Sequence, residues 1–298
     1  MKKAESHHPK KLSETVQQKV IEVAKKYLEI SSRYAVGEIC GVSATSVGKI
    51  LRKYGLAGKK EEQKQDKPMQ TYEWLRKNIC WSIDAVRIKF KGWLLYLLVL
   101  RDEYARLPLS TSISMTNSAF DAAELVKQTI RALKVKPVMV KKDRGSEFKG
   151  SEFQDELREE GIVDFTGPGY YPKFNGKHER GNKIFAKLQK LFYGKDVGLL
   201  KFLETVKEAV DFEANILPRM MFNGKTSREV YDEAKDYTAD ERQAFLARLL
   251  EVKTENERKK EQLKNDMLDV QRICIVKSAR DVNLLEVRMR ENANQLSV

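Results

Sequence analysis

Cysteine, histidine and long apolar runs are all scarce in this chain of 298 residues. The three cysteines, Cys40, Cys80 and Cys274, are widely spaced and odd in number, which excludes a disulfide framework and indicates reduced thiols in the cytoplasm. The three histidines cannot join them at any recognisable zinc spacing, so we expect no zinc. No stretch approaches the roughly 18 apolar residues of a membrane span. The charged first eleven residues have no apolar segment behind them, so we expect neither secretion nor membrane insertion.

Acidic residues are too few to balance the basic ones. The chain has 56 Lys and Arg against 43 Asp and Glu, a formal charge of +13. Its hydrophobic content of 41% is enough for sizeable cores, and at roughly 100 to 200 residues per domain the length allows about two domains and a tail. The charge favours binding to a polyanion, and a basic surface that serves only solubility is the simpler alternative.

The basic excess is concentrated in the first sixty residues, which carry thirteen Lys or Arg against five Glu, a net charge of +8. Ser13 can cap an amphipathic helix, and a shorter apolar segment then meets Gly41. Ser43 can cap a further helix that Gly55 ends. Two helices joined by a tight turn with glycine are typical of a helix-turn-helix, although a small helical bundle is an alternative. Candidate DNA contacts on the outward face are Thr45, Ser46, Lys49, Arg52 and Lys53.

The remaining chain divides by its pattern of apolar residues. Residues 57–72 are charged, lack apolar periodicity and predict a basic linker after a helix-turn-helix domain at 1–56. Beyond the linker, the pattern predicts an α/β core at 73–236 with a mixed sheet flanked by helices, followed by a charged helical tail at 237–298. The expected core strands are 80–90, 93–100, 106–114, 137–140 and 162–165, and the expected core helices begin at 117, 152, 175 and 199.

Three carboxylates occupy comparable places in this predicted core. Asp84 lies inside the first strand, Asp143 follows a buried strand, and Glu179 lies on a predicted helix. Acids on such elements can converge and hold two hard cations about 3.5 to 4 Å apart, which activate an attacking oxygen and stabilise the leaving oxygen of a phosphodiester. Each also has an ordinary interpretation: a solvent-facing strand residue, a turn residue and a helix-face acid.

Two other acids compete for this role. Asp102 is expected in a hairpin turn or paired with Arg106. Glu147 lies close to Asp143 in sequence and could assist a metal, but its position favours a first-turn helix residue or a surface acid.

The motifs around the three carboxylates resemble those of insertion-sequence transposases and retroviral-type integrases. The resemblance rests on WSID ending at Asp84, DRGSEF beginning at Asp143, and PKFNGKHER containing Glu179, with thirty-five residues between the last two acids. It spans about residues 72–234 and implies a ribonuclease H-like core in which the three acids hold Mg²⁺, with Mn²⁺ as a possible substitute. Arg144 stands where many relatives have Asn. A zinc module is missing upstream, which favours a transposase or phage-type recombinase over a retroviral enzyme.

The helix predicted to carry Glu179 also carries a row of cations. Lys183, Lys187 and Lys190 follow Glu179 at offsets that keep them on one side of the helix, where they could meet the phosphates of a DNA end. Lys177 and Arg180 are further candidate DNA contacts. A lysine-rich solvated face is the alternative.

These features lead to the hypothesis of a DNA transposase that binds element ends, exposes 3′ hydroxyls and joins them to target DNA. We expect double-stranded DNA as the partner, a homo-oligomer assembled on it, and a location in the cytoplasm with the nucleoid. The alternatives are a helix-turn-helix regulator that uses the core for oligomerisation, and a ribonuclease H-like nuclease without strand transfer.

Overall fold

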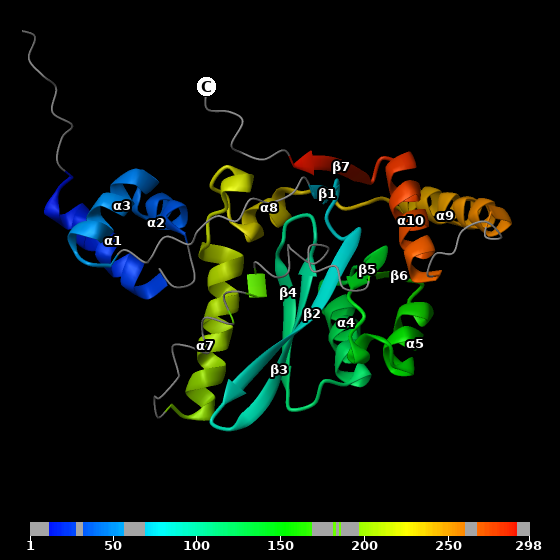
Figure 1. Ribbon diagram of the computed structural model, residues 1–298, viewed down its shortest axis with the longest axis horizontal. Coiled ribbons are helices and arrows are strands. Elements are labelled where there is room, and N and C mark those ends of the chain that lie inside the picture. The colour runs from blue at the N-terminus through cyan, green and yellow to red at the C-terminus, as the bar shows by residue number, and fades with distance from the viewer. Residues whose placement is uncertain are drawn as a thin grey trace, which may run out of the picture. The chain divides into compact units, whose positions relative to one another are not determined.

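The computed structural model describes residues 12–27, 32–56, 69–168, 181–182, 185, 197–259 and 267–290 (Figure 1). These residues form two compact units, of which the first contains the N-terminal helices with residues 217–225 and the second contains the rest. Within the described ranges, none of the helices is both long and apolar enough to cross a membrane.

The first unit is built on three short helices: α1 (Glu14–Tyr27), α2 (Arg33–Cys40) and α3 (Ala44–Lys53). Ser13 caps the start of α1, where its hydroxyl accepts a hydrogen bond from the Val16 amide, and Ser43 caps α3. The expected turn between α2 and α3 is present, with Gly41 in the left-handed conformation at φ 70°. The helices share a small apolar core formed by Val20, Ile21, Ala24, Val36, Val47, Ile50 and Leu51.

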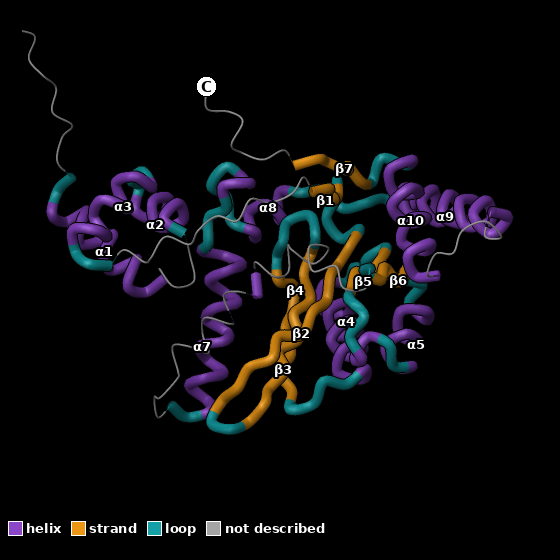
Figure 2. The backbone as a smooth tube through the Cα atoms, in the orientation of Figure 1, coloured by secondary structure: helices purple, strands orange, loops and turns teal. Residues whose placement is uncertain are grey.

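The second unit contains a mixed five-stranded sheet, which confirms the predicted fold class. Its strands are β2 (Cys80–Phe90), β3 (Trp93–Asp102), β4 (Pro108–Ser114), β5 (Met139–Lys142) and β6 (Val163–Thr166). They lie in the order β4-β3-β2-β5-β6 (Figure 2). The first three strands form an antiparallel meander, whereas β5 runs parallel to both β2 and β6. The sheet therefore has parallel strand ends side by side at β2 and β5, where ligand sites of α/β proteins commonly form.

Helices cover both faces of this sheet. On one face, α4 (Ala119–Leu133) and α5 (Ser151–Glu159) pack in a core with β2 side chains such as Trp81 and Ile83. On the other face, Phe202 of α7 (Leu199–Asp211) stacks on Phe90 of β2 with ring centroids 4.4 Å apart. The two contacts fall on opposite faces because side chains alternate along a strand.

The C-terminal region is helical, as expected, but it also contains a strand. Its elements are α8 (Ser227–Glu233), α9 (Ala239–Lys259), α10 (Met267–Asp281) and β7 (Leu285–Arg290). Strand β7 pairs antiparallel with β1 (Met69–Trp74), which corrects the expectation of an entirely helical tail and of a linker reaching residue 72. Each short strand is stabilised by a partner more than 200 residues away, so local periodicity did not reveal either one.

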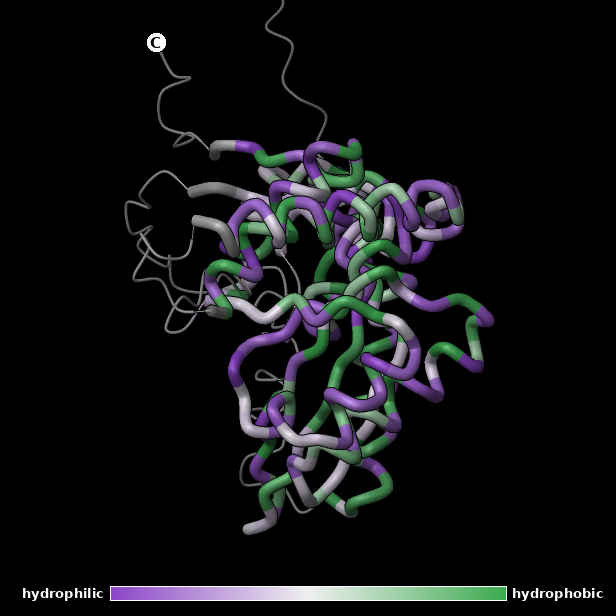
Figure 3. Tube along the Cα trace, turned by 90° about the vertical axis from the view of Figure 1, so that its right-hand side faces the viewer, coloured by the Kyte–Doolittle hydropathy of each residue, from purple (hydrophilic) through white to green (hydrophobic). Residues whose placement is uncertain are grey.

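The C-terminal helices share a second apolar core with the sheet. Phe245 and Val252 of α9 and Cys274 and Ile275 of α10 pack with Phe165 of the edge strand β6. Figure 3 shows hydrophobic and hydrophilic residues alternating along the helices, as expected where one face packs against a core. In this way α10 covers the edge of the sheet nearest to the predicted site.

Candidate active site

Asp84 and Asp143 come from adjacent parallel strands. Strands β2 and β5 are in register at Ser82 and Lys141, and each aspartate lies two residues further along. Side chains two residues apart point to the same face of a sheet, so the register places the two carboxylates next to each other. The sequence prediction that Asp84 and Asp143 converge is therefore matched by the geometry of the strands.

The electrostatics of Asp84 reflect this proximity. Its pKa is raised from 3.8 to about 6, first because the carboxyl is desolvated and then because the negative charge of Asp143 lies near it. The carboxylate of Glu147 also raises the pKa, while the Arg101 guanidinium lowers it. A second negative charge close to a partly desolvated carboxyl is an arrangement that a divalent cation would stabilise.

Two hydrogen bonds, one of them from Asn182, hold the Asp84 side chain. Its amide Nδ2 donates a hydrogen bond to Asp84 Oδ2 at 2.6 Å, and the Ala85 amide donates to Asp84 Oδ1 at 3.0 Å. The sequence reasoning missed Asn182, although it lies three residues after Glu179 and would share a helical face with it. The predicted site residues Glu179, Lys177, Arg180, Lys183, Lys187 and Lys190 lie outside the described residues.

Asp143 lies in a tight turn just beyond β5. Its Oδ1 accepts a hydrogen bond from the Gly145 amide at 2.8 Å, and its side chain is exposed. A Cβ at Gly145 would lie 2.7 Å from the Glu147 carboxylate, so a larger residue here would require the Glu147 side chain to move. Glu147 itself lies in the first turn of a short 3-10 helix, as one of its two sequence interpretations predicted, and it is buried, which corrects the alternative of a surface acid.

The two basic residues that flank Asp143 pair with acids from other elements. Lys142 Nζ lies 3.2 Å from Asp164 on β6, and Arg144 lies 3.5 Å from Asp269 on α10. Arg144 Nε also donates to the Gly167 carbonyl at 3.2 Å. These ion pairs connect the segment around Asp143 to strand β6 of the sheet and to helix α10.

A buried ion pair lies on the Asp84 face of the sheet. Arg101 of β3 contacts Glu213 at 2.7 Å, and both side chains are almost fully buried. Glu213 belongs to a π-helical turn, η3 (Phe212–Ile216), which directly follows α7. A Cβ at Gly181 would lie 2.6 Å from the Arg101 guanidinium, so the glycine allows the segment bearing Asn182 to approach the pair.

Asp102 is the last residue of β3 and adjoins the hairpin turn in which one of the two sequence interpretations expected it. Its carboxylate accepts hydrogen bonds from the amides of Asn78 at 2.8 Å and Ala105 at 2.7 Å. Arg106 pairs with Glu73 at 3.6 Å. Burial raises the pKa of Asp102 to about 7. Asp102 therefore has a structural role in the turn.

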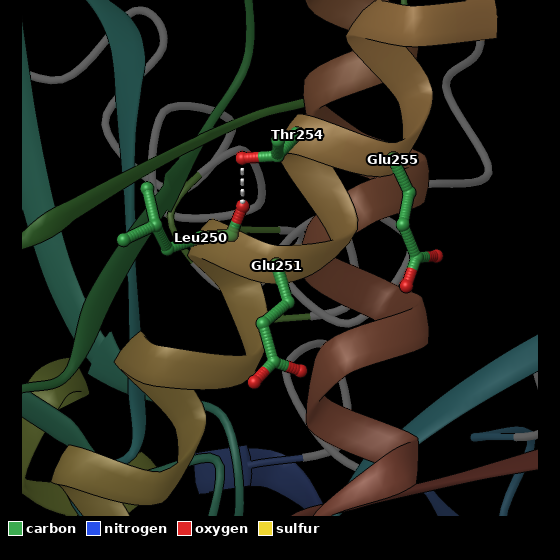
Figure 4. A pocket seen from close by; sticks show the side chains of 4 residues that line it. All are labelled: Leu250, Glu251, Thr254 and Glu255. Carbon is green, nitrogen blue, oxygen red and sulfur yellow. Dashed lines mark hydrogen bonds between the residues drawn. The ribbon is translucent and has the colours of Figure 1, made fainter.

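Among the described residues, no group of three His, Cys, Asp or Glu side chains is arranged to hold a metal. A recess on α9 is lined by Leu250, Glu251, Thr254 and Glu255 (Figure 4). Its two glutamates are already paired with Arg248, so it offers little to a ligand.

In the first unit, α3 presents the predicted DNA-contact residues. Thr45, Lys49, Arg52 and Lys53 are exposed, whereas Ser46 is half-buried with its hydroxyl 2.9 Å from that of Ser43. A Cβ at Gly37 of α2 would lie 2.5 Å from the Val42 carbonyl, so this glycine permits the close approach of α2 to the turn. The sequence reasoning did not identify Gly37. Contact of α3 with DNA stays a prediction.

Comparison with known proteins identifies the central part of the second unit. Residues 75–172 match the family model of the integrase core domain. This segment is similar to integrase core domains. The match covers about a third of the chain and includes both Asp84 and Asp143. No curated protein matches the sequence.

Several solved integrases resemble the chain in structure. The HTLV-2 integrase catalytic core, solved in complex with magnesium as a trimer, is 22% identical with a TM-score of 0.44, covering 53% of this chain and 99% of that one. A simian T-cell lymphotropic virus intasome, in complex with the PP2A regulatory subunit B56 gamma, is 19% identical with a TM-score of 0.49, covering 74% and 78%. The BIV integrase core is 18% identical with a TM-score of 0.42, covering 52% and 95%.

Proposed function

We propose that this protein is a DNA transposase of the integrase class. The observation that carries the proposal is the pair Asp84 and Asp143, adjacent on parallel strands of an integrase core domain. Glu179 is the proposed third acid, and Asn182, three residues after it, hydrogen-bonds to Asp84. That hydrogen bond supports a position for Glu179 close to the two aspartates.

The donors present fit Mg²⁺, with Mn²⁺ as a substitute. Hard divalent cations prefer oxygen ligands, and Asp84 and Asp143 supply carboxylate oxygens. Burial and then the negative charge of Asp143 raise the pKa of Asp84. Two such ions would activate an attacking oxygen and stabilise a leaving oxygen of a phosphodiester. The chain itself orients Asp84 through Asn182 and fixes Asp143 through the Gly145 amide, so both carboxylates are preorganised.

The proposed reaction has two steps at this site. Water first cuts the end of the element and leaves a 3′ hydroxyl, which then attacks a target phosphodiester in line without a covalent enzyme intermediate. The exposed face of α3 would recognise the element ends, with base contacts from Thr45 and phosphate contacts from Lys49 and Arg52. Joining two ends in one event calls for a homo-oligomer assembled on double-stranded DNA.

Asp143→Asn tests the proposal directly. With Mg²⁺ and the native flanking repeats, we expect the wild-type chain to give 3′-processed ends and joined products, and the variant to give neither. DNA binding should stay near wild type because Asp143 is a ligand for the metal and not for DNA. An equal loss of binding and joining would rule out the metal-ligand role.

The same assay separates the two alternatives. A regulator that uses the core only to oligomerise would bind DNA without any metal-dependent change to it. A nuclease without strand transfer would cut DNA regardless of end sequence and give no joined product.

A further inference from the structure

The β2–β3 hairpin extends beyond the sheet to which it belongs. Strand β2 pairs with β5 only as far as Ser82, and β4 pairs with β3 only from Tyr96 onward. The outer part of the hairpin is therefore a two-stranded ribbon (Figure 1). Lys91 and Gly92 close it with φ angles of 45° and 84°, the left-handed values of a two-residue hairpin turn. Stacking of Phe90 on Phe202 of α7 supports the ribbon from one face.

This outer end, which we term the hairpin tip, exposes a large aromatic side chain. The hairpin tip comprises Arg87, Lys89 and Leu94 on one face of the ribbon and Trp93 on the other, because Lys89 pairs with Leu94 whereas Trp93 pairs with Phe90. Trp93 is 60% exposed and Leu94 40%, whereas the other two tryptophans, Trp74 and Trp81, are buried. An exposed tryptophan next to a well-formed turn has a large apolar surface available to a partner.

The hairpin tip is also purely basic. Between Asp84 and Asp102 the sequence has four Lys or Arg and no acid. Arg87 and Lys89 are exposed, and no carboxylate in the described part of the chain pairs with either one. Lys201 on the nearby α7, by contrast, is paired with Glu204 at 3.2 Å. Two cations without a counter-charge would interact favourably with an anionic partner.

Charge and aromatic surface together favour a nucleic acid over a second copy of this chain. In a two-fold dimer through the face that carries Arg87 and Lys89, the same basic side chains would face each other across the interface and repel. Arg87 and Lys89 lie two residues apart on one strand face, about 6.6 Å, which places both within reach of neighbouring phosphates of one DNA strand. The Trp93 ring can stack on a base or insert at a base step.

We propose that the hairpin tip is a DNA-binding surface in which Arg87 and Lys89 contact phosphates and Trp93 contacts the bases of double-stranded DNA. The proposal rests on the proposed function, because it assumes that the core works on DNA. It adds to the predicted α3 surface a contact on the catalytic unit itself.

Trp93 provides a direct readout. Acrylamide should quench the fluorescence of the free chain mainly through Trp93, since Trp74 and Trp81 are buried, and Trp93→Phe should remove that quenchable signal. Binding of a mixed-sequence DNA duplex should protect Trp93 and reduce quenching toward the level of the variant. Unchanged quenching in a chain saturated with duplex would overturn the proposal. Protection that grows with protein concentration in the absence of DNA would overturn it in favour of a second copy.

Salt dependence tests the two cations. If Arg87 and Lys89 each contact one phosphate, R87A/K89A should reduce the slope of log K against log salt by about 1.8, at about 0.9 per contact. The matched control is K127A/K136A, which removes the same charge from partly exposed lysines that already pair with Glu156 and Glu160, and should leave the slope unchanged. Equal effects of the two double variants would contradict the proposal.

The outcome also separates this proposal from the proposed function. If the wild-type chain processes and joins DNA ends while Trp93 stays unprotected on the duplex, only the hairpin tip contact fails. If Trp93 is protected on the duplex but Mg²⁺ yields no cut or joined product, the transposase function fails and the contact stands. A wild-type chain that binds no duplex contradicts both.

Discussion

At the scale of single residues, the site depends on hydrogen bonds that hold two like-charged carboxyls close together. Burial first and then the negative charge of Asp143 disfavour the ionised form of Asp84 and raise its pKa. Asn182 donates to one oxygen of Asp84 and the Ala85 amide donates to the other. The orientation of Asp84 is thus determined by hydrogen bonds from residues outside the pair of aspartates.

Asn182→Ala should therefore weaken metal binding and activity. Loss of a residue that orients a ligand typically costs about 10- to 100-fold in metal affinity or activity. Titration with Mn²⁺ and the joining assay would measure the two effects. Asn215→Ala is a matched control because Asn215 donates to Asp211 at the same 2.6 Å, but on an exposed helix surface. A similar loss in both variants would argue against orientation of Asp84 by Asn182.

The raised pKa of Asp102 leads to a prediction about how the stability of the fold depends on pH. Its pKa is about 7 in the fold against 3.8 for the free side chain, so between these values the folded state holds a proton that the unfolded state has lost. The free energy of unfolding should therefore fall as pH rises from about 4 to about 7. Asp84, with a pKa of about 6, acts in the same direction over a narrower range.

The measurement is urea unfolding at several pH values. Asp102→Asn should be less stable at low pH, because an amide nitrogen cannot accept the backbone hydrogen bond that a carboxyl oxygen accepts, but its stability should fall less as pH rises. Asp84→Asn measures separately how much Asp84 contributes to the pH dependence of the free energy of unfolding. A variant Asp102→Asn with the full pH dependence of the wild type would show that other groups cause it.

At the scale of elements, much of the fold could be predicted from the sequence. The long-range contacts that stabilise the surroundings of the site could not. The strands and helices of the core follow from local periodicity, and the Asp84 and Asp143 motifs lie on strands that the sequence predicts. The contact of Arg101 with Glu213 joins residues 112 positions apart, and neither residue has a local pattern that indicates burial. Pairs of this kind depend on tertiary packing, as does the pairing of β1 with β7.

Glu213→Gln tests the importance of the π-helical turn. Removing one partner of a buried ion pair leaves the other charge uncompensated and typically costs about 3 to 5 kcal/mol of unfolding free energy. Glu255→Gln is the matched control, since its pair with Lys277 at 3.3 Å is about half exposed and should contribute at most about 1 kcal/mol. Urea denaturation gives both values, and a cost for Glu213→Gln no larger than for the control would contradict the proposed importance of the pair.

At the scale of the whole molecule, the net charge of +13 is distributed over two units. The first sixty residues account for +8, and α3 exposes Lys49 and Arg52. The second unit adds Arg87 and Lys89 of the hairpin tip, which pair with no carboxylate among the described residues. We therefore predict that part of the excess charge is available to DNA at these two surfaces.

If both surfaces hold the same duplex, their contributions to salt dependence should add. K49A/R52A and R87A/K89A should each reduce the slope of log K against log salt by about 1.8, and the quadruple variant by about 3.6, because each phosphate contact contributes about 0.9. Additivity is expected for sites that share no partners, and each compact unit contains one of these surfaces. Fluorescence anisotropy on the intact chain over a range of KCl concentrations gives the four slopes. A quadruple variant no flatter than K49A/R52A alone would mean that the catalytic unit does not touch the DNA that α3 binds.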